Sequence, residues 1–367
     1  MRWNWQQPDW PRFTFETQRL TASEDNFLLA SGVLLGAYLH LPDAEKETFT
    51  VDLLSTEALK TSEIEGEMLR RDSVQSSIRK RFGLASGPNS PSPSESGIAE
   101  MMVDLYRHFS APLTHQTLYA WHAMMMNGRR ELTQIGAYRQ HAEPMQVVSG
   151  RIDAPKIHFE APPSTQVPAE MDRFIRWFND TGPNGKTPLP ALTRAGIAHL
   201  YFESIHPFED GNGRLGRSVS EKALAQAIGK PVLVGLSETI QAHRKRYYQM
   251  LEDSNKSQAI TDWLLYFADV VLTAQKNSHD RVAFVIAQAA FYDRFRETLN
   301  PRQQKVMARI FREGPRGFKG GLSAEKYLAL TGTSRATATR DLTDLVEKGA
   351  LTKSGIGKGT RYFPSLR

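Results

Sequence analysis

The sequence contains no cysteine, which excludes disulfide bonds and thiolate metal sites. Any bound metal must then be held by carboxylate, imidazole or substrate oxygen atoms, which favours a hard cation such as Mg²⁺. No apolar run approaches the roughly 20 residues that a membrane-spanning helix needs, and none follows the charge at the N-terminus. We therefore expect a cytoplasmic protein without membrane contact.

The length and charge of the chain set broader limits. With 367 residues, 40% of them hydrophobic, the chain can bury two or three cores at roughly 150 residues per domain. Its net charge of +6 permits binding to polyanions, either nucleotide phosphates or nucleic acid. Many soluble proteins are as basic as this, so the location of the charge along the chain carries more information than its sum.

One compositional break divides the chain. Residues 83–97 are rich in Ser, Pro and Gly and indicate an exposed linker. Before it, helical apolar spacing over 27–40 and 51–81, with Ile64 and Met68 one turn apart, predicts an N-terminal helical module within residues 1–96. After it, the same spacing predicts helices over 98–109, 114–127, 167–179, 192–205, 216–228, 237–255 and 259–279.

Two short segments depart from this helical pattern. The β-prone runs 146–150 and 156–159, separated by turn residues, predict a single hairpin. At the C-terminus, helical patterns over 301–311, 324–330 and from the cap Ser334 to Lys348 precede β-prone runs that flank a glycine-rich stretch. Three helices followed by a hairpin predict a winged helix-turn-helix domain over residues 284–367.

The run from His206 to Arg217 reads His-Pro-Phe-Glu-Asp-Gly-Asn-Gly-Arg-Leu-Gly-Arg. Pro207 and the glycines prevent continuous helix, whereas a helix can begin near Arg214, so backbone N–H groups at its start can bind an anion. Arg214 and Arg217 lie on one face of that helix and can reach phosphates. Asp210 can hold the Mg²⁺ that bridges those phosphates, and His206 can take a proton from a hydroxyl.

These are the parts that phosphoryl or nucleotidyl transfer requires. The alternative is a structural helix–turn–helix with a buried histidine and solvated arginines. The run resembles the signature of the Fic family, His-x-Phe-x-Asp/Glu-Gly-Asn-Gly-Arg-x-x-Arg, at every specified position. The resemblance covers about residues 98–279 and implies a mainly α-helical Fic core, residues 97–283, that transfers AMP from ATP to a Ser, Thr or Tyr hydroxyl of a target protein.

The resemblance also implies residue roles. His206 would be the general base, Asp210 the Mg²⁺ ligand, and Arg214 and Arg217 the residues that hold the β- and γ-phosphates. The α-phosphate would lie on Gly211, Asn212 and Gly213, and adenosine would contact Tyr247 and Asn255. An aromatic pair on a helix also suits a core. The hairpin 146–159 would be the flap that holds a target segment by strand addition, although an ordinary surface hairpin fits the sequence equally well.

The run Thr61-Ser62-Glu63-Ile64-Glu65-Gly66 resembles the Fic inhibitory motif, Ser/Thr-x-x-x-Glu-Gly/Asn. In this resemblance a helix over about 52–70 carries Glu65, which would pair with Arg217, occupy the γ-phosphate position and leave the resting enzyme inactive. The alternative is a solvated acidic helix face. The N-terminal Trp3, Trp5 and Trp10 resemble the segment often attached to bacterial Fic proteins, and we expect them to dock onto the helical core or to bind a partner.

Two alternatives of function stay open. In the first, the protein is a nucleotide-sensing transcriptional regulator that binds DNA through residues 300–367, with basic and hydroxyl side chains on a recognition helix and a wing: Arg335, Thr337, Thr339, Arg340, Lys353, Lys358 and Arg361. In the second, the Fic core removes AMP, with Glu65 orienting water, or transfers another phosphate-containing group. A homodimer is also left open.

Overall fold

The computed structural model describes residues 2–87, 90–151, 154–231, 233–314, 317–318 and 320–366. The described chain is mainly helical, as expected, with two small antiparallel sheets. Its helices in chain order are α1 (Thr17–Leu39), α2 (Asp43–Ile64), α3 (Arg71–Arg81), α4 (Pro93–Arg107), α5 (His115–Met125), α6 (Val167–Asp180), α7 (Ala191–Ile205), α8 (Asn212–Ile228), α9 (Leu236–Ala242), α10 (Arg244–Ser254), α11 (Thr261–Phe295), α12 (Pro301–Arg312), α13 (Ala324–Thr331) and α14 (Arg335–Glu347). Its strands are β1 (Gln146–Arg151), β2 (Ala154–Glu160), β3 (Leu351–Ser354) and β4 (Arg361–Pro364).

The chain divides into two compact units. The larger unit comprises residues 1–36 and 46–277, and the smaller unit comprises residues 37–45 and 278–367. Helix α3 and the part of α2 from Lys46 onward therefore belong to the same unit as the motif 206–217. Within the described residues, no helix is both long and apolar enough to cross a bilayer.

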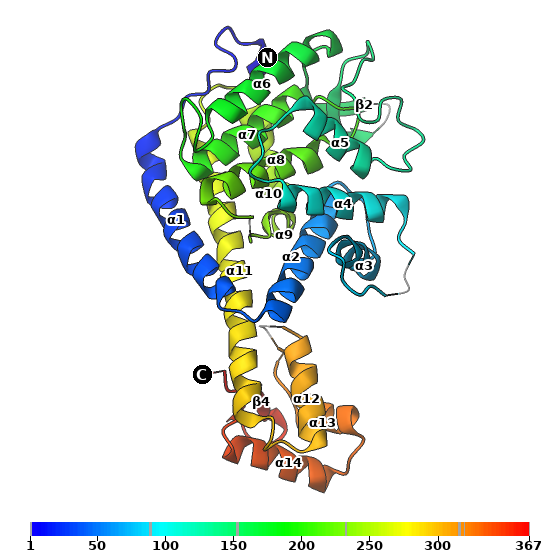
Figure 1. The fold of residues 1–367 in the computed structure, drawn as a ribbon, viewed down its shortest axis with the longest axis vertical. Coiled ribbons are helices and arrows are strands. Elements are labelled where there is room, and N and C mark those ends of the chain that lie inside the picture. The colour runs from blue at the N-terminus through cyan, green and yellow to red at the C-terminus, as the bar shows by residue number, and fades with distance from the viewer. Residues whose placement is uncertain are drawn as a thin grey trace. The chain divides into compact units, whose positions relative to one another are not determined.

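Helices α7 and α8 form the centre of the larger unit, where they lie against each other (Figure 1). Every residue of α7 except Glu203 is buried, as expected of a helix surrounded by others. The chain reverses between the end of α7 and the start of α8, over residues 206–211. The motif loop is thus held between two buried helices, which gives its side chains a rigid support.

The segment after α2 differs from the sequence prediction. One helical pattern over 51–81 was expected, but α2 ends at Ile64 and α3 begins at Arg71. Gly66 has φ +87°, a conformation that ends helices readily only at glycine. Met68, expected on the apolar face, is 78% exposed. The helix predicted over 52–70 is therefore wrong at its end, and Glu65 lies in a turn.

The linker prediction is wrong at its C-terminal end. Residues 93–97 belong to α4, whose N-cap Ser92 accepts a hydrogen bond from the backbone N of Glu95. The Glu95 carboxylate accepts a hydrogen bond from the backbone N of Ser92 in return, which completes a capping box, and Pro93 occupies the first helical position. The Pro and Ser residues that indicated a loop thus start a helix here.

Three further helix boundaries were misplaced. The pattern over 237–255 is interrupted at His243, whose non-helical backbone separates α9 from α10. The pattern over 259–279 continues as α11 to Phe295, beyond the expected start of the C-terminal domain at residue 284. The helix predicted over 27–40 begins ten residues earlier, at Thr17. The remaining predicted helices are present with ends shifted by a few residues, because local spacing does not fix where a helix terminates.

The smaller unit contains the three helices and the hairpin expected there. Helices α12, α13 and α14 precede strands β3 and β4, which pair with Leu351 opposite Pro364. Buried apolar residues from the three helices and from β3 form a separate core, including Val306, Tyr327 and Leu342. The order of elements is that of a winged helix.

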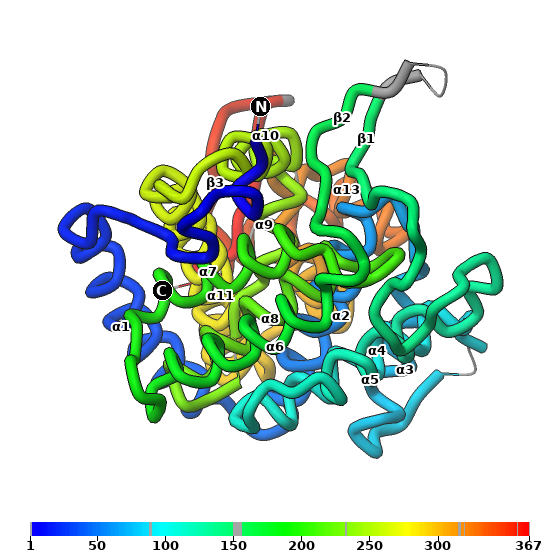
Figure 2. Tube along the Cα trace, turned by 90° about the horizontal axis from the view of Figure 1, so that it is seen from above, coloured from blue at the N-terminus to red at the C-terminus, as the bar shows by residue number. Residues whose placement is uncertain are grey.

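The predicted hairpin is also present. Strands β1 and β2 pair antiparallel, with an irregularity between Val147 and Val148 that strengthens the local twist. Figure 2 shows this hairpin extending from the helices of the larger unit. The N-terminal segment secures its base, because the indole N–H of Trp5 donates to the carbonyl of Glu160 and Trp3 packs edge-on against Phe159. The expected docking of the tryptophans on the folded unit is thus observed.

Candidate active site

The loop that carries His206 has a strained backbone. His206 follows α7 with φ +50° and is the one non-glycine residue with positive φ in the described chain. Arg139, 1% exposed, holds this turn: its Nε donates to the carbonyl of His206 at 2.8 Å, and its backbone N donates to the carbonyl of Pro207. An αL conformation at a non-glycine residue costs free energy and persists where surrounding contacts impose it. Such strain is common at functional sites.

The start of α8 forms the second half of the loop. Gly211 caps the helix with φ +81°, and the Asn212 side chain closes the turn through hydrogen bonds to both the N–H and the carbonyl of Phe208. The first N–H groups of a helix have no partner within the helix and attract anions. The N–H groups at the start of α8 can therefore attract an anion, although that of Gly211 donates to Asp210 Oδ1 here, whereas the Asn212 side chain has a structural task.

Glu65 occupies that anion site. Its Oε1 lies 2.7 Å from Arg217 Nη2, and a Cβ placed on Gly213 would come within 2.2 Å of the same oxygen. Arg217, 1% exposed, also donates from Nε to the Thr61 hydroxyl. Tyr248 on α10 donates to the carbonyl of Ile64 and so holds the end of α2 in place. The structure therefore brings Glu65 and Arg217 together as the sequence predicted.

A second acidic residue pairs with the other arginine. Glu67 Oε2 lies 2.7 Å from Arg214 Nη1, and the Arg214 side chain is 4% exposed. The sequence indicated no partner for Glu67, because the turn after Ile64 was expected to be helical. Both arginines are thus covered by the same turn.

Asp210 sits beside the anion site and is paired with Arg129. The distance from Arg129 Nη2 to Asp210 Oδ2 is 2.9 Å. His122, buried and stacked on Phe208, contacts the Asp210 carbonyl through Nε2 at 3.2 Å. Among the described residues, no group of three or more His, Asp or Glu side chains could hold a metal by itself. Asp210 fits Mg²⁺ in the way that one carboxylate and substrate phosphates share it.

A cavity of about 670 Å³ opens in front of these groups. Its lining brings together eight site residues that the sequence singled out: Glu65, His206, Asp210, Gly211, Asn212, Gly213, Tyr247 and Asn255. The Tyr247 hydroxyl contacts His199 Nε2 at 2.7 Å, and Asn255 Nδ2 donates to the carbonyl of His158 on β2. Arg214 and Arg217 do not line the cavity, because the turn that carries Glu65 covers them.

Burial and local charges determine the protonation of the site. Burial, assisted by the nearby Arg139 guanidinium, lowers the pKa of His206 to about 4, so the imidazole is neutral at pH 7. Burial also raises the pKa of Glu203 to about 8, with a further contribution from Glu65. Burial opposes the charge of Arg217, but the carboxylate of Glu65 outweighs it and raises the pKa of Arg217. His206 is therefore uncharged at pH 7, and Arg217 carries its positive charge.

Several functional residues were missed from the sequence. Three of them contact a motif residue that lies 67 to 88 positions later in the chain, and no local pattern marks them. They are Arg139, Arg129 and His122. Glu203 lies only three residues before His206, but an acid at a helix end is expected to be solvated. Each of these roles depends on burial and on long-range packing.

Two segments of the chain match known families. Residues 112–224 match the Fic/DOC family. The chain carries a Fic domain. Residues 3–84, which include the turn that covers the arginines, match a domain of unknown function (DUF4172). The motif loop and most of the helices around it thus fall inside the Fic match, whereas Glu65 and Glu67 fall in the segment that precedes it.

Curated relatives match a limited part of the chain. The "Protein adenylyltransferase Fic" of Drosophila sechellia is 32% identical over 99 residues, which are 27% of this chain and 18% of the relative. The match to the same-named protein of Drosophila melanogaster has the same identity and extent. The chain thus covers less than a fifth of the length of these relatives.

Solved structures share the fold. A Fic family protein from Desulfovibrio desulfuricans superposes with a TM-score of 0.52 at 19% identity, over 97% of this chain and 98% of that chain. A Fic domain containing signaling protein from Bacteroides thetaiotaomicron superposes with a TM-score of 0.52 at 18% identity, over 69% and 95%. At this identity the likeness concerns the fold alone.

Proposed function

We propose that the protein is an adenylyltransferase that moves AMP from ATP to a Ser, Thr or Tyr hydroxyl of a protein. The observation that supports this most is the cavity in which a neutral His206, the start of α8 and the nucleoside residues Tyr247 and Asn255 meet. The Drosophila relatives named as adenylyltransferases favour the same reaction.

The reaction follows from the positions of these groups. His206 Nδ1 faces the last turn of α7, 3.4 Å from the carbonyl of Glu203, so Nε2 is left to accept the proton of the target hydroxyl. As the O–H bond breaks, the oxygen attacks the α-phosphorus in line and the bond to the β-phosphate breaks. Pyrophosphate leaves with that electron pair. The backbone N–H groups of Gly211 to Gly213 would stabilise the charge on the α-phosphate, once that of Gly211 is released from Asp210 Oδ1.

Mg²⁺ would be held by Asp210 and by phosphate oxygens of ATP, and it would neutralise charge on the leaving group. Asp210 is paired with Arg129 at 2.9 Å, so that ion pair must loosen when the cation binds. Arg214 and Arg217 would hold the β- and γ-phosphates once they are uncovered. These assignments retain the roles that the motif implies.

The resting protein would be inhibited by its own N-terminal segment. Glu65 lies where an anion would bind at the start of α8, and Glu67 engages the second arginine. A triphosphate cannot occupy the same positions while both ion pairs are intact. Activation therefore requires the turn after α2 to move away from α8.

The target segment would bind along the hairpin 146–159. Val148 on β1 and Ile157 on β2 are 51% and 44% exposed, which offers apolar contacts to an added strand. The hairpin also lines the cavity through Val148 and His158, so a hydroxyl on such a segment would be presented to His206. Residues 152 and 153 of the expected flap lie outside the described residues.

The decisive test is mass spectrometry of the protein after incubation with Mg²⁺ and ATP. An AMP adduct on the protein itself, absent from His206→Ala, would support the proposal. Loss of AMP from a previously modified protein, without addition, would instead favour the reverse reaction with Glu65 orienting water. A different phosphate-containing adduct would identify another transferred group.

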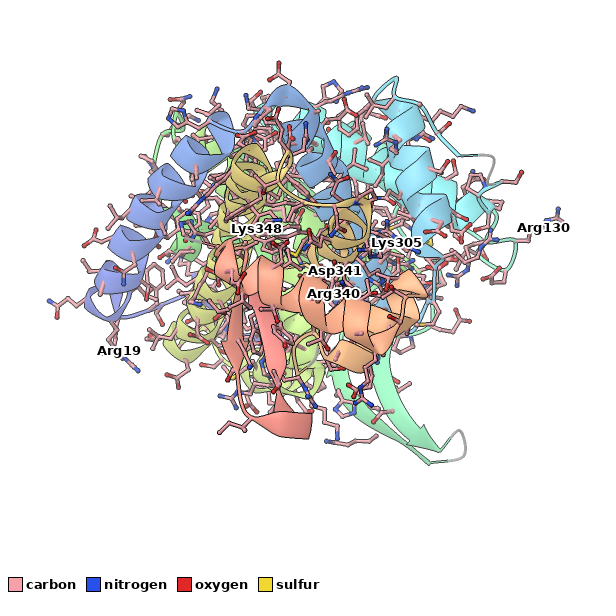
Figure 3. All side chains as sticks on the ribbon, turned by 90° about the horizontal axis from the view of Figure 1, so that it is seen from below. Arg19, Arg130, Lys305, Arg340, Asp341 and Lys348 are labelled. Atoms are coloured by element: carbon pink, nitrogen blue, oxygen red, sulfur yellow. The ribbon has the colours of Figure 1, made fainter. Side chains whose placement is uncertain are left out.

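The smaller unit supports a second activity, binding to DNA. Arg335 and Arg340 are exposed on α14, and Lys353 is exposed on β3; Figure 3 labels Arg340. This places cations on the recognition helix and the wing of a winged helix, as DNA phosphates require. The side chain of Lys358 lies outside the described residues.

Fluorescence anisotropy of the full protein with duplex DNA tests this activity. We expect affinity to fall at least about tenfold between about 50 and 200 mM salt, because binding releases counterions. Arg340→Glu should weaken binding, whereas charge reversal at Lys305 on α12 should have a smaller effect. Absence of binding at low salt would assign the unit to protein docking.

A further inference from the structure

Glu203 lines the cavity beside His206 and faces the Nδ1 atom of that imidazole. It lies in the last turn of α7, and its Oε2 is 3.8 Å from His206 Nδ1. This distance is within ion-pair reach but longer than a hydrogen bond. The carbonyl of the same residue is 3.4 Å from Nδ1. The carboxyl oxygen Oε2 and the backbone carbonyl oxygen of Glu203 therefore both favour the tautomer of His206 with a proton on Nδ1.

The Glu203 side chain is 13% exposed, but one of its two carboxyl oxygens is buried without compensation. Its Oε1 is buried and has no hydrogen-bond partner among the described residues. A Cβ on Gly216 of α8 would come within 2.4 Å of that oxygen, so the space for the carboxyl depends on a glycine. A buried polar atom without a partner costs free energy and calls for an explanation. Stability does not supply one.

Charged and titratable groups face Glu203 from four elements. They are His199 and His206 on or directly after α7, Glu65 in the turn after α2, Arg217 on α8 and Tyr247 on α10. Burial contributes most to the raised pKa of Glu203, Glu65 raises it further, and Arg217 lowers it. In the resting protein at pH 7 the carboxyl is therefore mostly protonated and uncharged.

We propose that Glu203 is a positioning residue for His206, whose ionised carboxylate orients the imidazole through Nδ1 and stabilises the imidazolium that forms when Nε2 takes the target proton. The inference rests on the proposed role of His206 as the base. In this arrangement Glu203 fixes the tautomer of the base His206 and stabilises its charged form, as the orienting residue does in other enzymes with an activated nucleophile. Glu203 would act through His206, although it also lines the cavity.

The geometry links this role to the inhibitory turn. Only the ionised carboxylate can stabilise an imidazolium, and the charge of Glu65 opposes that ionisation. Withdrawal of Glu65 removes one cause of the raised pKa of Glu203. Glu65 would thus inhibit the enzyme twice, by covering Arg217 and by keeping Glu203 uncharged.

The test compares Glu65→Gly with Glu65→Gly/Glu203→Gln, so that the inhibitory contact is absent from both. The first should show kcat/KM for ATP rising with pH as Glu203 ionises, with an apparent pKa below that of Glu203 in the resting protein. The double variant should lose this ascending limb and fall at least about tenfold at its plateau, with KM for ATP nearly unchanged. Glu24→Gln in the Glu65→Gly background is the matched control. Glu24 is a buried acid on α1, and it accepts hydrogen bonds from the backbone of Leu192 and Thr193 at the start of α7. It should leave the pH profile unchanged.

Nuclear magnetic resonance of the imidazole nitrogens gives a readout independent of activity. In the wild-type protein the Nδ1 signal of His206 should shift as the pH rises through about 8, the pKa of Glu203, and this step should be absent in Glu203→Gln. If Glu203→Gln does not fold, Glu203→Asp, which shortens the acid by one methylene, should keep the pH-dependent step with a lower rate.

The outcomes separate the inference from the proposed function. Identical pH profiles and identical Nδ1 titrations with and without the Glu203 carboxyl would overturn the positioning role. The pH-dependent shift of the His206 Nδ1 signal could be absent in Glu203→Gln while the protein transfers no AMP under any condition. That result would support the interaction of Glu203 with His206 and reject the proposed reaction. A drop in rate with an unchanged pH profile would reduce Glu203 to a structural residue and also overturn the inference.

Discussion

Replacing Glu65 with glycine removes the carboxylate that covers the anion site of α8. This carboxylate accepts a charge-assisted hydrogen bond of 2.7 Å from Arg217, whose side chain is 1% exposed, whereas that of Glu65 is 27% exposed. Without Glu65, Arg217 keeps its hydrogen bonds to the Thr61 hydroxyl and carbonyl, so it stays in place. The catalytic loop itself is unaltered.

The size of the effect follows from that bond. A hydrogen bond to a charged group contributes about 1.5–3 kcal/mol, less where solvent reaches one partner. At about 1.4 kcal/mol per tenfold change in population, the competent state should gain about 10- to 100-fold, and automodification should rise accordingly. The protein should also unfold a few degrees lower, at about 2–4 °C per kcal/mol for a unit of this size.

The assay measures AMP incorporation by intact mass at saturating Mg²⁺ and ATP. Glu63→Ala is the matched control, because Glu63 lies on α2 but pairs with Lys60 and not with Arg217. Arg217→Ala should not activate, since that residue is needed to hold phosphate once Glu65 has gone. Unchanged or lower activity in Glu65→Gly would refute autoinhibition and favour AMP removal.

Four further results are expected. His206→Ala should lower AMP transfer at least about 10²-fold while calorimetry shows ATP affinity nearly unchanged, since the base acts in the transition state. Glu67→Ala should increase AMP transfer less than Glu65→Gly does, because it frees Arg214 alone. An equal increase would show that the two ion pairs hold the inhibitory turn cooperatively. Arg139→Ala should lower both Tm and AMP transfer, because the carbonyls of Ile205 and His206 lose their side-chain donor, although the backbone N of residue 139 still donates to Pro207. Folding raises the pKa of Glu203 from 4.5 to about 8, so between these pH values the folded wild-type protein retains a proton that the unfolded chain releases. The stability of the wild-type protein should therefore fall as the pH rises from about 5 to about 8. Thermal melts of Glu203→Gln should lack this fall.

Local sequence determined the parts of the site that a short stretch of chain can specify by itself. Pro207 and Gly211 forbid a continuous helix and place the start of α8 after them, so the anion site could be derived from the residues alone. Likewise, two β-prone runs with turn residues between them specify a hairpin. The pairing of Glu65 with Arg217 was reached through a resemblance, since 152 residues separate the two.

The tertiary structure decided the electrostatics and the supports. Arg139 reaches the strained turn of His206, and Arg129 reaches Asp210, across sequence distances over which no periodicity operates. The pKa values of His206 and Glu203 depend on how much water the packed helices exclude, which the identity of a residue does not encode. Sequence thus specified which groups are present and how each local turn bends, because those depend on neighbouring residues. Packing decided which groups meet and in which protonation state, because burial is a property of the assembled fold.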